Sequence, residues 1–273
     1  MLAVYLLVVR TYWGQKLDEE VFTGRTLISD ARVDQANEFL GAVSLGSLAL
    51  VTILIAAVAF ARRRPRLALL AAGSLIAAVV STEILKYVVF ERPDLYPTIL
   101  NDIANTYPSG HATIGMGAAL AVLLIVPARL RLATALGAGA VGSAFGVAVV
   151  AAGWHRPSDV VGAYFVCLAT ASLAAAVSSA FPDHPAATER PGPAPRIGLT
   201  ELVLIALGLA VVALFGLAAL TVKGIPWTSS GAGFLISSSA IVVLAFAAVG
   251  ALAWGMASAE GTPTGSEPAP PGR

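Results

Sequence analysis

The chain is organised around Pro108-Ser109-Gly110-His111, which stands at the start of an apolar run that continues to about residue 128. Proline is preorganised for the first position of a helix, because its fixed φ is already helical. The run is about twenty residues long, the length that an α-helix needs to cross a ~30 Å hydrocarbon layer. The stretch therefore predicts a membrane-spanning helix with polar groups in its first turn.

Composition extends this prediction to the whole chain. Of 273 residues, 57% are hydrophobic and 12% are charged, and the mean hydropathy is +0.81. A soluble domain carries roughly 25% charged residues. The predicted fold class is all-α, a polytopic transmembrane helical bundle. The net charge of +1 gives no reason to expect nucleic acid, and the single cysteine, Cys167, has no intrachain disulfide partner.

Eight spans are predicted from the apolar runs. The short first run, residues 1–9, fits a truncated span, a signal-like segment or the end of a longer helix, and we interpret it as the first span. The polar residues 14–20 then form an aqueous loop. The other spans are predicted at about 37–61, 67–90, 108–128, 132–153, 158–181 (capped by Ser158 or Asp159), 197–222 and 233–257.

The domain division follows from these spans. Residues 1–181 are predicted to form a six-helix membrane domain, and 182–198 a Pro-rich cytoplasmic linker. Residues 199–257 form a two-helix C-terminal membrane extension. The tail, 258–273, is rich in Gly, Pro and Glu and is predicted to be disordered.

Short basic loops orient the spans. The arginines within 62–66 and 129–131 fall on one side, which the positive-inside rule places in the cytoplasm. Arg190 and Arg196 of the linker return to that side. The loop 91–107 and the turn 153–159 then face the extracytoplasmic side, so two polar clusters are predicted to meet at one membrane face.

The first cluster is the predicted helix start at Ser109. Backbone amides there have no intrahelical partners and, with the helix dipole, form an anion site that Gly110 lets a ligand approach closely. His111 would stand beside a bound phosphate. An ordinary helix cap with an interfacial histidine is the alternative, and the tetrapeptide alone does not decide between them.

The second cluster pairs His155 with Asp159, four residues apart. A carboxylate at that spacing can hold one imidazole nitrogen and leave the other free as a nucleophile or base. A solvated turn with an Asp cap is the alternative. Lys86 and Arg92 could grip a phosphate, arginine through its bidentate fork and lysine as a point charge. Their alternative is a snorkelling lysine and a loop arginine.

Taken together, these residues resemble the signature of the type 2 phosphatidic acid phosphatase superfamily. That family shows Lys-x6-Arg-Pro, then Pro-Ser-Gly-His, then Ser-Arg-x5-His-x3-Asp. The matches here are Lys86 with Arg92-Pro93, residues 108–111, and His155 with Asp159. The resemblance covers about residues 80–165, implies a six-helix phosphatase core up to 181, and leaves the last two spans outside.

Two departures from the family pattern stand out. Only five residues separate Lys86 from Arg92, which turns the lysine by ~100° on a continuous α-helix. The third-motif Ser-Arg falls on Ala148 and Val149, so one phosphate-binding arginine is missing. Arg156 is the nearby basic candidate to replace it.

The resemblance implies a mechanism. His155 attacks phosphorus to form a phosphohistidine, Asp159 orients His155, His111 protonates the leaving oxygen, and water hydrolyses the intermediate. The implied phosphate-binding residues are Lys86, Arg92, Ser109, Gly110 and, as a substitute, Arg156. No cofactor is implied, and no carboxylate pair or His/Cys set is arranged to hold a metal.

The implied function is that of an integral membrane phosphatase, multi-pass in the cell membrane, acting at its extracytoplasmic face. Candidate substrates are an isoprenoid phosphate or pyrophosphate, a phosphatidic-acid-type lipid and a lipid-linked sugar phosphate. Its other partners are membrane lipids, and a homo-oligomer is compatible with it. A catalytically weak lipid-phosphate binder or assembly protein is the first rival, favoured by the missing arginine. A transporter is the second, but its charged residues would lie near mid-membrane in several spans.

Overall fold

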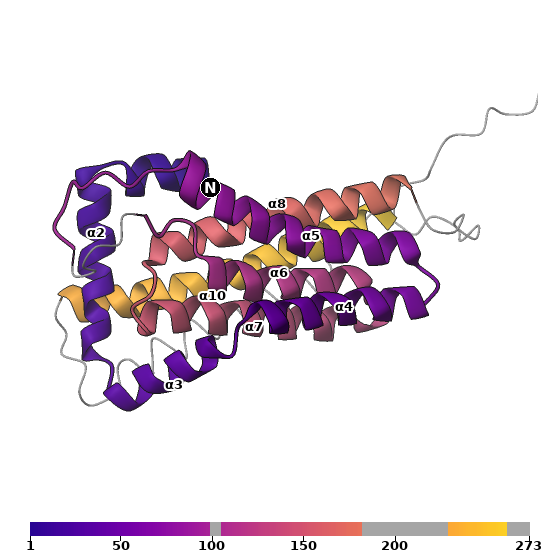
Figure 1. The fold of residues 1–273 in the computed structure, drawn as a ribbon, viewed down its shortest axis with the longest axis horizontal. Coiled ribbons are helices and arrows are strands. Elements are labelled where there is room, and N and C mark those ends of the chain that lie inside the picture. Colours follow the sequence, from indigo (N-terminus) through magenta and orange to yellow (C-terminus); the bar gives the residue numbers. More distant parts are fainter. Residues whose placement is uncertain (99–104, 182–228, 261–273) are drawn as a thin grey trace, which may run out of the picture.

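The computed structural model describes residues 1–98, 105–181 and 229–260, and the regular elements among them are all helical (Figure 1). This confirms the all-α prediction. The elements are α1 (Leu2–Val4), η1 (Tyr5–Val9), α2 (Tyr12–Thr23), η2 (Gly24–Leu27), α3 (Asp30–Gly41), α4 (Leu45–Ala61), α5 (Pro65–Ile84), η3 (Leu85–Val89), α6 (Gly110–Ile125), η4 (Ala128–Leu130), α7 (Arg131–Ala151), α8 (Pro157–Ala180) and α10 (Ser229–Glu260). The long helices lie along the molecule's long axis, and α2 stands across one end (Figure 1).

Four of the described helices are long and apolar enough to cross a membrane, and a bent pair, α3 with α4, raises the number to five. The predicted spans at 67–90, 132–153 and 158–181 correspond to three of the four, and the span at 233–257 corresponds to α10. The span at 108–128 is the shorter helix α6. These four or five candidate spans do not test the predicted division into six core helices and two C-terminal helices.

One sequence prediction near the N-terminus is wrong, and two others are tested only in part. Residues 2–9 form α1 and the π-helix η1, which fits the truncated span and the helix end considered for this run and does not decide between them. The segment 14–20 is part of α2 and not an aqueous loop. The predicted span at 37–61 corresponds to the bent pair α3 and α4, which meet at 60° and together count as one candidate span.

The break between α3 and α4 has a local cause at Ser44. The Ser44 hydroxyl accepts a hydrogen bond from the Ser47 N–H (3.1 Å), and the Ser47 hydroxyl accepts one from the Ser44 N–H (2.8 Å). This capping box starts a new helix in the middle of an apolar stretch.

At the C-terminal end, α10 continues to Glu260, three residues into the segment predicted as the tail. The predicted linker and the span at 197–222 lie outside the described residues, as does the rest of the tail.

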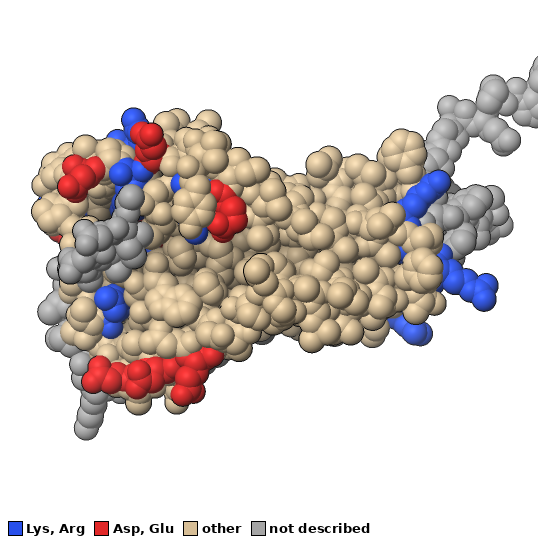
Figure 2. All heavy atoms as spheres, in the orientation of Figure 1, with Lys and Arg blue, Asp and Glu red and all other residues tan. Residues whose placement is uncertain are grey.

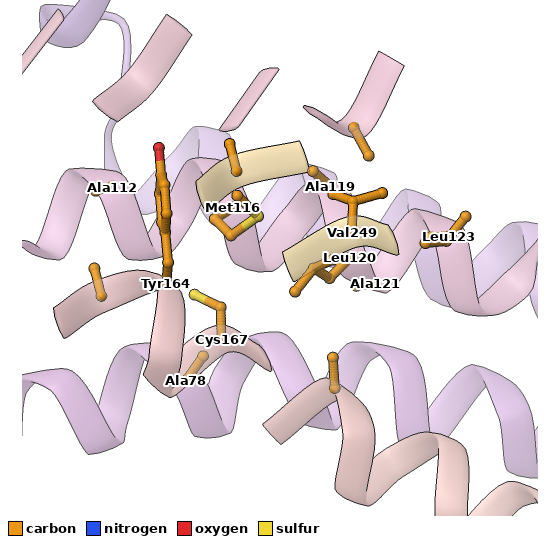
Figure 3. Close-up of a cluster of buried hydrophobic side chains, with 14 of the residues drawn as sticks. Ala78, Ala112, Met116, Ala119, Leu120, Ala121, Leu123, Tyr164, Cys167 and Val249 are labelled. Carbon is orange, nitrogen blue, oxygen red and sulfur yellow. The ribbon is translucent and has the colours of Figure 1, made fainter. Parts of the chain in front are cut away.

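The core is built from small residues and a few large ones, part of which Figure 3 shows around Met116, Tyr164 and Cys167. Helix α6 packs against α5, α7 and α8. A Cβ on Gly142 of α7 would lie 2.4 Å from the Met116 Cε, so this glycine is what lets α7 approach α6. The Tyr164 hydroxyl donates to the Gly142 carbonyl (2.7 Å) and ties α8 to α7.

The two ends of the bundle differ in charge. Arg62, in the α4–α5 turn, donates to the Ile125 carbonyl at the end of α6 (2.5 Å), which places the basic turns at 62–66 and 128–131 at one end. On the face in Figure 2, that end shows Lys and Arg only, the middle is uncharged, and the opposite end shows both signs. Helix α5 ends, and α6 and α8 begin, at that opposite end (Figure 1).

Candidate active site

Ser109 joins the two predicted clusters. Its buried hydroxyl caps α6 by accepting a hydrogen bond from the Ala112 N–H (3.3 Å). Its own N–H donates to the carbonyl of Asp159 on α8 (3.0 Å). The first turns of α6 and α8 are therefore fixed to each other by a backbone hydrogen bond.

His155 and Asp159 form the pair expected from their spacing. The His155 Nδ1 lies 3.3 Å from the Asp159 Oδ2, and the same oxygen accepts the Arg156 N–H (3.0 Å). Asp159 is fully buried. Proline at the first position of α8 fixes the start of the helix that carries this carboxylate. The pairing through Nδ1 leaves Nε2 outside this contact, the arrangement in which a carboxylate orients an imidazole.

His111 lies in the first turn of α6, near the pair. Its ring meets that of Trp154 edge to face, with 4.9 Å between centroids. His111 also interacts electrostatically with His155 and Lys86. His111 and His155 therefore lie near the starts of α6 and α8, within electrostatic range of each other.

Lys86 comes close to the start of α6. A Cβ on Gly110 would lie 3.9 Å from the Lys86 Nζ and 3.3 Å from a carboxylate oxygen of Glu83. Lys86 belongs to the π-helix η3, which ends at the extended residue Phe90. The rotation of ~100° expected from the short Lys86–Arg92 spacing assumes a continuous α-helix, and that condition does not hold here.

Arg92 is buried beside α2, with a side chain that is 7% exposed. Its Nη2 lies 3.6 Å from the Asp18 Oδ2. Its Nη1 is also buried and has no hydrogen-bond partner among the described residues. Arg92 interacts electrostatically with Asp159, so this cation belongs to the same site.

Arg156 is 2% exposed and is engaged through all three guanidinium nitrogens. Its Nε donates to the Glu19 Oε2 (2.8 Å), its Nη1 to the Thr106 hydroxyl (3.4 Å) and its Nη2 to the Thr98 hydroxyl. An oxyanion reaching Arg156 would share the guanidinium with Glu19.

Sequence reasoning missed the polar face of α2. Gln15, Asp18 and Glu19 are buried, and with Phe22 they show the i, i+3, i+4, i+7 spacing of one helix face. That spacing is the signal that was present in the sequence. Burial, aided by repulsion from Asp159, raises the pKa of Asp18 from its ordinary 3.8 to about 6.

Arg25, like Arg156, is a cation near the site that the family motifs do not include. Gly153 adopts φ +80°, and a Cβ there would lie 2.5 Å from the Arg25 Cζ, so the arginine packs directly on the turn that precedes His155. The Arg25 guanidinium lies over the Phe22 ring, 4.9 Å from its centroid. Its Nε is buried without a hydrogen-bond partner in the described part of the chain.

The arrangement has the parts that phosphoryl transfer needs. It combines an imidazole oriented by a carboxylate, a second imidazole, several cations and a helix N-terminus. Within residues 1–98, 105–181 and 229–260, no group of three or more His, Cys, Asp or Glu side chains could hold a metal ion.

Comparison with known proteins gives one result. No curated protein and no solved structure matches the chain. The sequence model of the PAP2 superfamily matches residues 39–183, just over half of the chain, and this range includes both histidines of the site and excludes α2 and α10. The chain therefore belongs to the PAP2 superfamily, which indicates a phosphatase, and its long apolar helices agree with a place in the membrane.

Proposed function

We propose that the protein is an integral membrane phosphatase that hydrolyses a lipid phosphate through a phosphohistidine on His155. The observation that carries the proposal is the buried His155–Asp159 pair, attached through the Ser109 N–H to the start of α6. A histidine that only packed in the core would not need a buried carboxylate and a helix N-terminus beside it.

In the first step the His155 Nε2 attacks phosphorus, and the ester P–O bond breaks as the N–P bond forms. His111 gives its proton to the leaving oxygen, so the lipid departs as an alcohol. Asp159 holds the imidazole through Nδ1 and stabilises the positive charge that develops on it.

In the second step a water molecule attacks the phosphohistidine and gives a proton to His111. The N–P bond breaks, inorganic phosphate leaves, and His155 is restored. Charge spread over the phosphoryl oxygens is the main barrier to both steps. In this proposal it is neutralised by Lys86, Arg92 and the α6 N-terminus, where Ser109 serves as the cap and Gly110 leaves room for an oxygen.

A lipid substrate is supported by the place of the site at one end of the bundle. Helix α2 crosses that end, and its outer face exposes Tyr12, Trp13 and Leu17. Aromatic and apolar side chains of this kind are enriched at the membrane–water interface. The basic turns lie at the other end, which by the positive-inside rule is cytoplasmic, so the active site faces the extracytoplasmic side of the cell membrane.

The missing third-motif arginine defines the alternative. Val149 is fully buried where the family has that arginine. Either Arg156 supplies the charge while it is paired with Glu19, or the site is inherently slow. In the second case the protein is a lipid-phosphate binder or assembly protein that keeps the site.

The test is phosphate release by the purified protein in detergent with EDTA present. The panel contains an isoprenoid phosphate and pyrophosphate, a phosphatidic acid and a lipid-linked sugar phosphate. We expect turnover on at least one of them, and a covalent phosphoenzyme when a ³²P-labelled substrate is quenched in alkali. His155→Ala should abolish both signals.

His184→Ala is the matched control, because it removes the one histidine outside the two clusters, and it should behave as the wild type. Full activity in His155→Ala would exclude the phosphohistidine mechanism. Strict dependence on added Mg²⁺ would indicate another enzyme class. Tight binding of a lipid phosphate without turnover would favour the binder.

A further inference from the structure

Helix α2 turns three polar side chains into the protein, although it lies outside the residues that match the family. It stands across the end of the bundle where the site is built (Figure 1). Gln15 donates to the Pro93 carbonyl (2.6 Å), and Glu19 pairs with Arg156 (2.8 Å). The third side chain, Asp18, contacts two parts of the site at once.

Asp18 joins the loop after η3 to the start of α8. One carboxylate oxygen accepts the Ser158 N–H (3.1 Å), and the other accepts the Ser158 hydroxyl (2.6 Å). The second oxygen also lies 3.6 Å from the Arg92 Nη2. A single carboxylate thus determines how far the Arg92 guanidinium lies from the first turn of α8.

The contact with Ser158 is linked to the proposed nucleophile, His155, through the next residue of the chain. Ser158 is followed directly by Asp159, which holds the His155 Nδ1. The N–H groups of a helix's first turn have no intrahelical partner, so an external acceptor there determines the position of that turn. Through Ser158, Asp18 therefore acts on the carboxylate that orients the imidazole.

The contact with Arg92 acts on the phosphate-binding side. Asp18 engages Nη2, whereas Nη1 is buried and has no hydrogen-bond partner among the described residues. The guanidinium is thus held by one arm, and the other arm remains for an oxyanion. The negative charge of Asp18 also competes with that oxyanion for Arg92.

The charge of Asp18 is not needed for its contacts with Ser158. A neutral amide can accept the Ser158 N–H and costs less to bury than a carboxylate. Asp18 is instead buried near Asp159, a second carboxylate, which repels it. Of the contacts that Asp18 makes, the one with Arg92 is the one that depends on its negative charge, which an amide lacks.

We propose that Asp18 is a positioning residue of the reaction, which holds the phosphate-binding guanidinium of Arg92 and the nucleophile-bearing turn of α8 at one fixed separation. The proposal rests on the phosphatase function proposed above. It assigns to α2 a part in catalysis that the family motifs do not contain.

The test compares Asp18→Asn with Glu20→Gln. Both substitutions remove one carboxylate from α2. Glu20, however, is exposed, and its carboxylate lies 3.8 Å from the Lys16 Nζ. We measure kcat on the best lipid phosphate and the Ki of inorganic phosphate, in detergent with EDTA. In Asp18→Asn, kcat should fall at least tenfold, because the two parts of the site are no longer held together. The Ki of phosphate should fall at least threefold, because Arg92 has lost its competing anion.

Ser158→Ala separates the two contacts. It removes the hydroxyl held by Asp18 and keeps the charge beside Arg92. We expect kcat to fall and the Ki of phosphate to stay within twofold of the wild-type value. Glu20→Gln should leave both quantities within twofold.

A lower Ki of phosphate together with a lower kcat is not what loss of structure produces, because partial unfolding weakens phosphate binding as well as slowing the reaction. An Asp18→Asn protein in which Ki rises as kcat falls would therefore overturn the proposal, and so would one that behaves like Glu20→Gln. A wild-type protein that hydrolyses no lipid phosphate would instead overturn the proposed function, and the inference with it.

Discussion

At the scale of single residues, two arginines of the candidate site, Arg92 and Arg156, are paired with carboxylates of α2. Arg156 contacts Glu19 at 2.8 Å, and Arg92 contacts Asp18 at 3.6 Å. Removing one partner of a buried pair leaves the other charge uncompensated, which is strongly destabilising. In the proposed function, a substitution of either arginine is expected to change both catalysis and stability, and an experiment has to separate the two effects.

The first prediction concerns Arg156. If it replaces the missing arginine, Arg156→Ala should cost at least ~2 kcal/mol of transition-state stabilisation, about 30-fold in kcat/KM. Arg156→Lys should restore part of this loss, because lysine keeps the charge and loses the bidentate fork. The measurement is kcat/KM at a temperature where thermal unfolding shows each variant folded.

The control is the double variant with Glu19→Gln, which removes the carboxylate that Arg156→Ala leaves unpaired. We expect it to recover thermal stability and not kcat/KM. Recovery of kcat/KM to within twofold of the wild type would mean that Arg156 serves only to neutralise Glu19. The slow-site interpretation would then be favoured.

The sequence predicted the motif residues and missed their partners for a physical reason. His155 and Asp159 are one helical turn apart, so their contact follows from spacing. Arg156 and Glu19 are 137 positions apart, and Ser158 and Asp18 are 140 apart. Such contacts depend on how α2 docks, which no local pattern determines.

At the scale of elements, α2 shows where hydrophobic patterning fails. A helix normally buries an apolar face, so a segment as polar as 14–20 is predicted to be a loop and not a packed helix. Here the buried face consists of Gln15, Asp18, Glu19 and Phe22, while Trp13 on the outside is 73% exposed. The buried carboxylates of α2 are satisfied by polar groups of the site, Glu19 by Arg156 and Asp18 by Ser158.

The second prediction concerns the pH dependence of stability. The pKa of Asp18 rises from 3.8 to about 6 on folding, so the fold favours the protonated carboxyl. This contribution is complete below pH 3.8 and is lost as the pH rises through 6. A change of about two pKa units corresponds to ~3 kcal/mol. The Tm of Asp18→Asn minus that of the wild type should therefore increase between pH 4 and pH 7.

Tryptophan fluorescence during heating in detergent measures both Tm values. Glu20→Gln provides the baseline, and its Tm difference from the wild type should not follow the Asp18 titration. A Tm difference for Asp18→Asn that decreased with pH would show that pairing with Arg92 outweighs the cost of burial.

At the scale of the whole molecule, hydropathy predicted the long spans, and topology determined the rest. Composition alone identified the helices that became α5, α7, α8 and α10. It could not show that α10 packs on α7, where Phe246 occupies the space beside Gly139. Nor could it show that α10 supports α2, where a Cβ on Gly233 would lie 3.0 Å from the Val21 Cγ2. The C-terminal helix is thus part of the frame that holds α2 over the site.

The third prediction concerns the orientation of this frame in the membrane. The basic turns and the active site lie at opposite ends, so the positive-inside rule places the site outside. The native Cys167 is 1% exposed and leaves a nearly silent background for labelling. An impermeant maleimide should label Asp94→Cys in intact cells, and Arg64→Cys only after the membrane is permeabilised. Both positions are exposed.

The unsubstituted chain, with Cys167 alone, should show no labelling before or after permeabilisation. Labelling of Arg64→Cys from outside, with Asp94→Cys protected, would invert the orientation. The phosphatase would then act on lipids of the inner leaflet with its chemistry unchanged. Labelling of both from the same side would have a larger consequence, because an odd number of spans could not lie between the two positions. Helix α5 would then not cross the membrane, and if that side were the cytoplasm, the proposed place of Lys86 and Arg92 at the extracytoplasmic surface would be excluded.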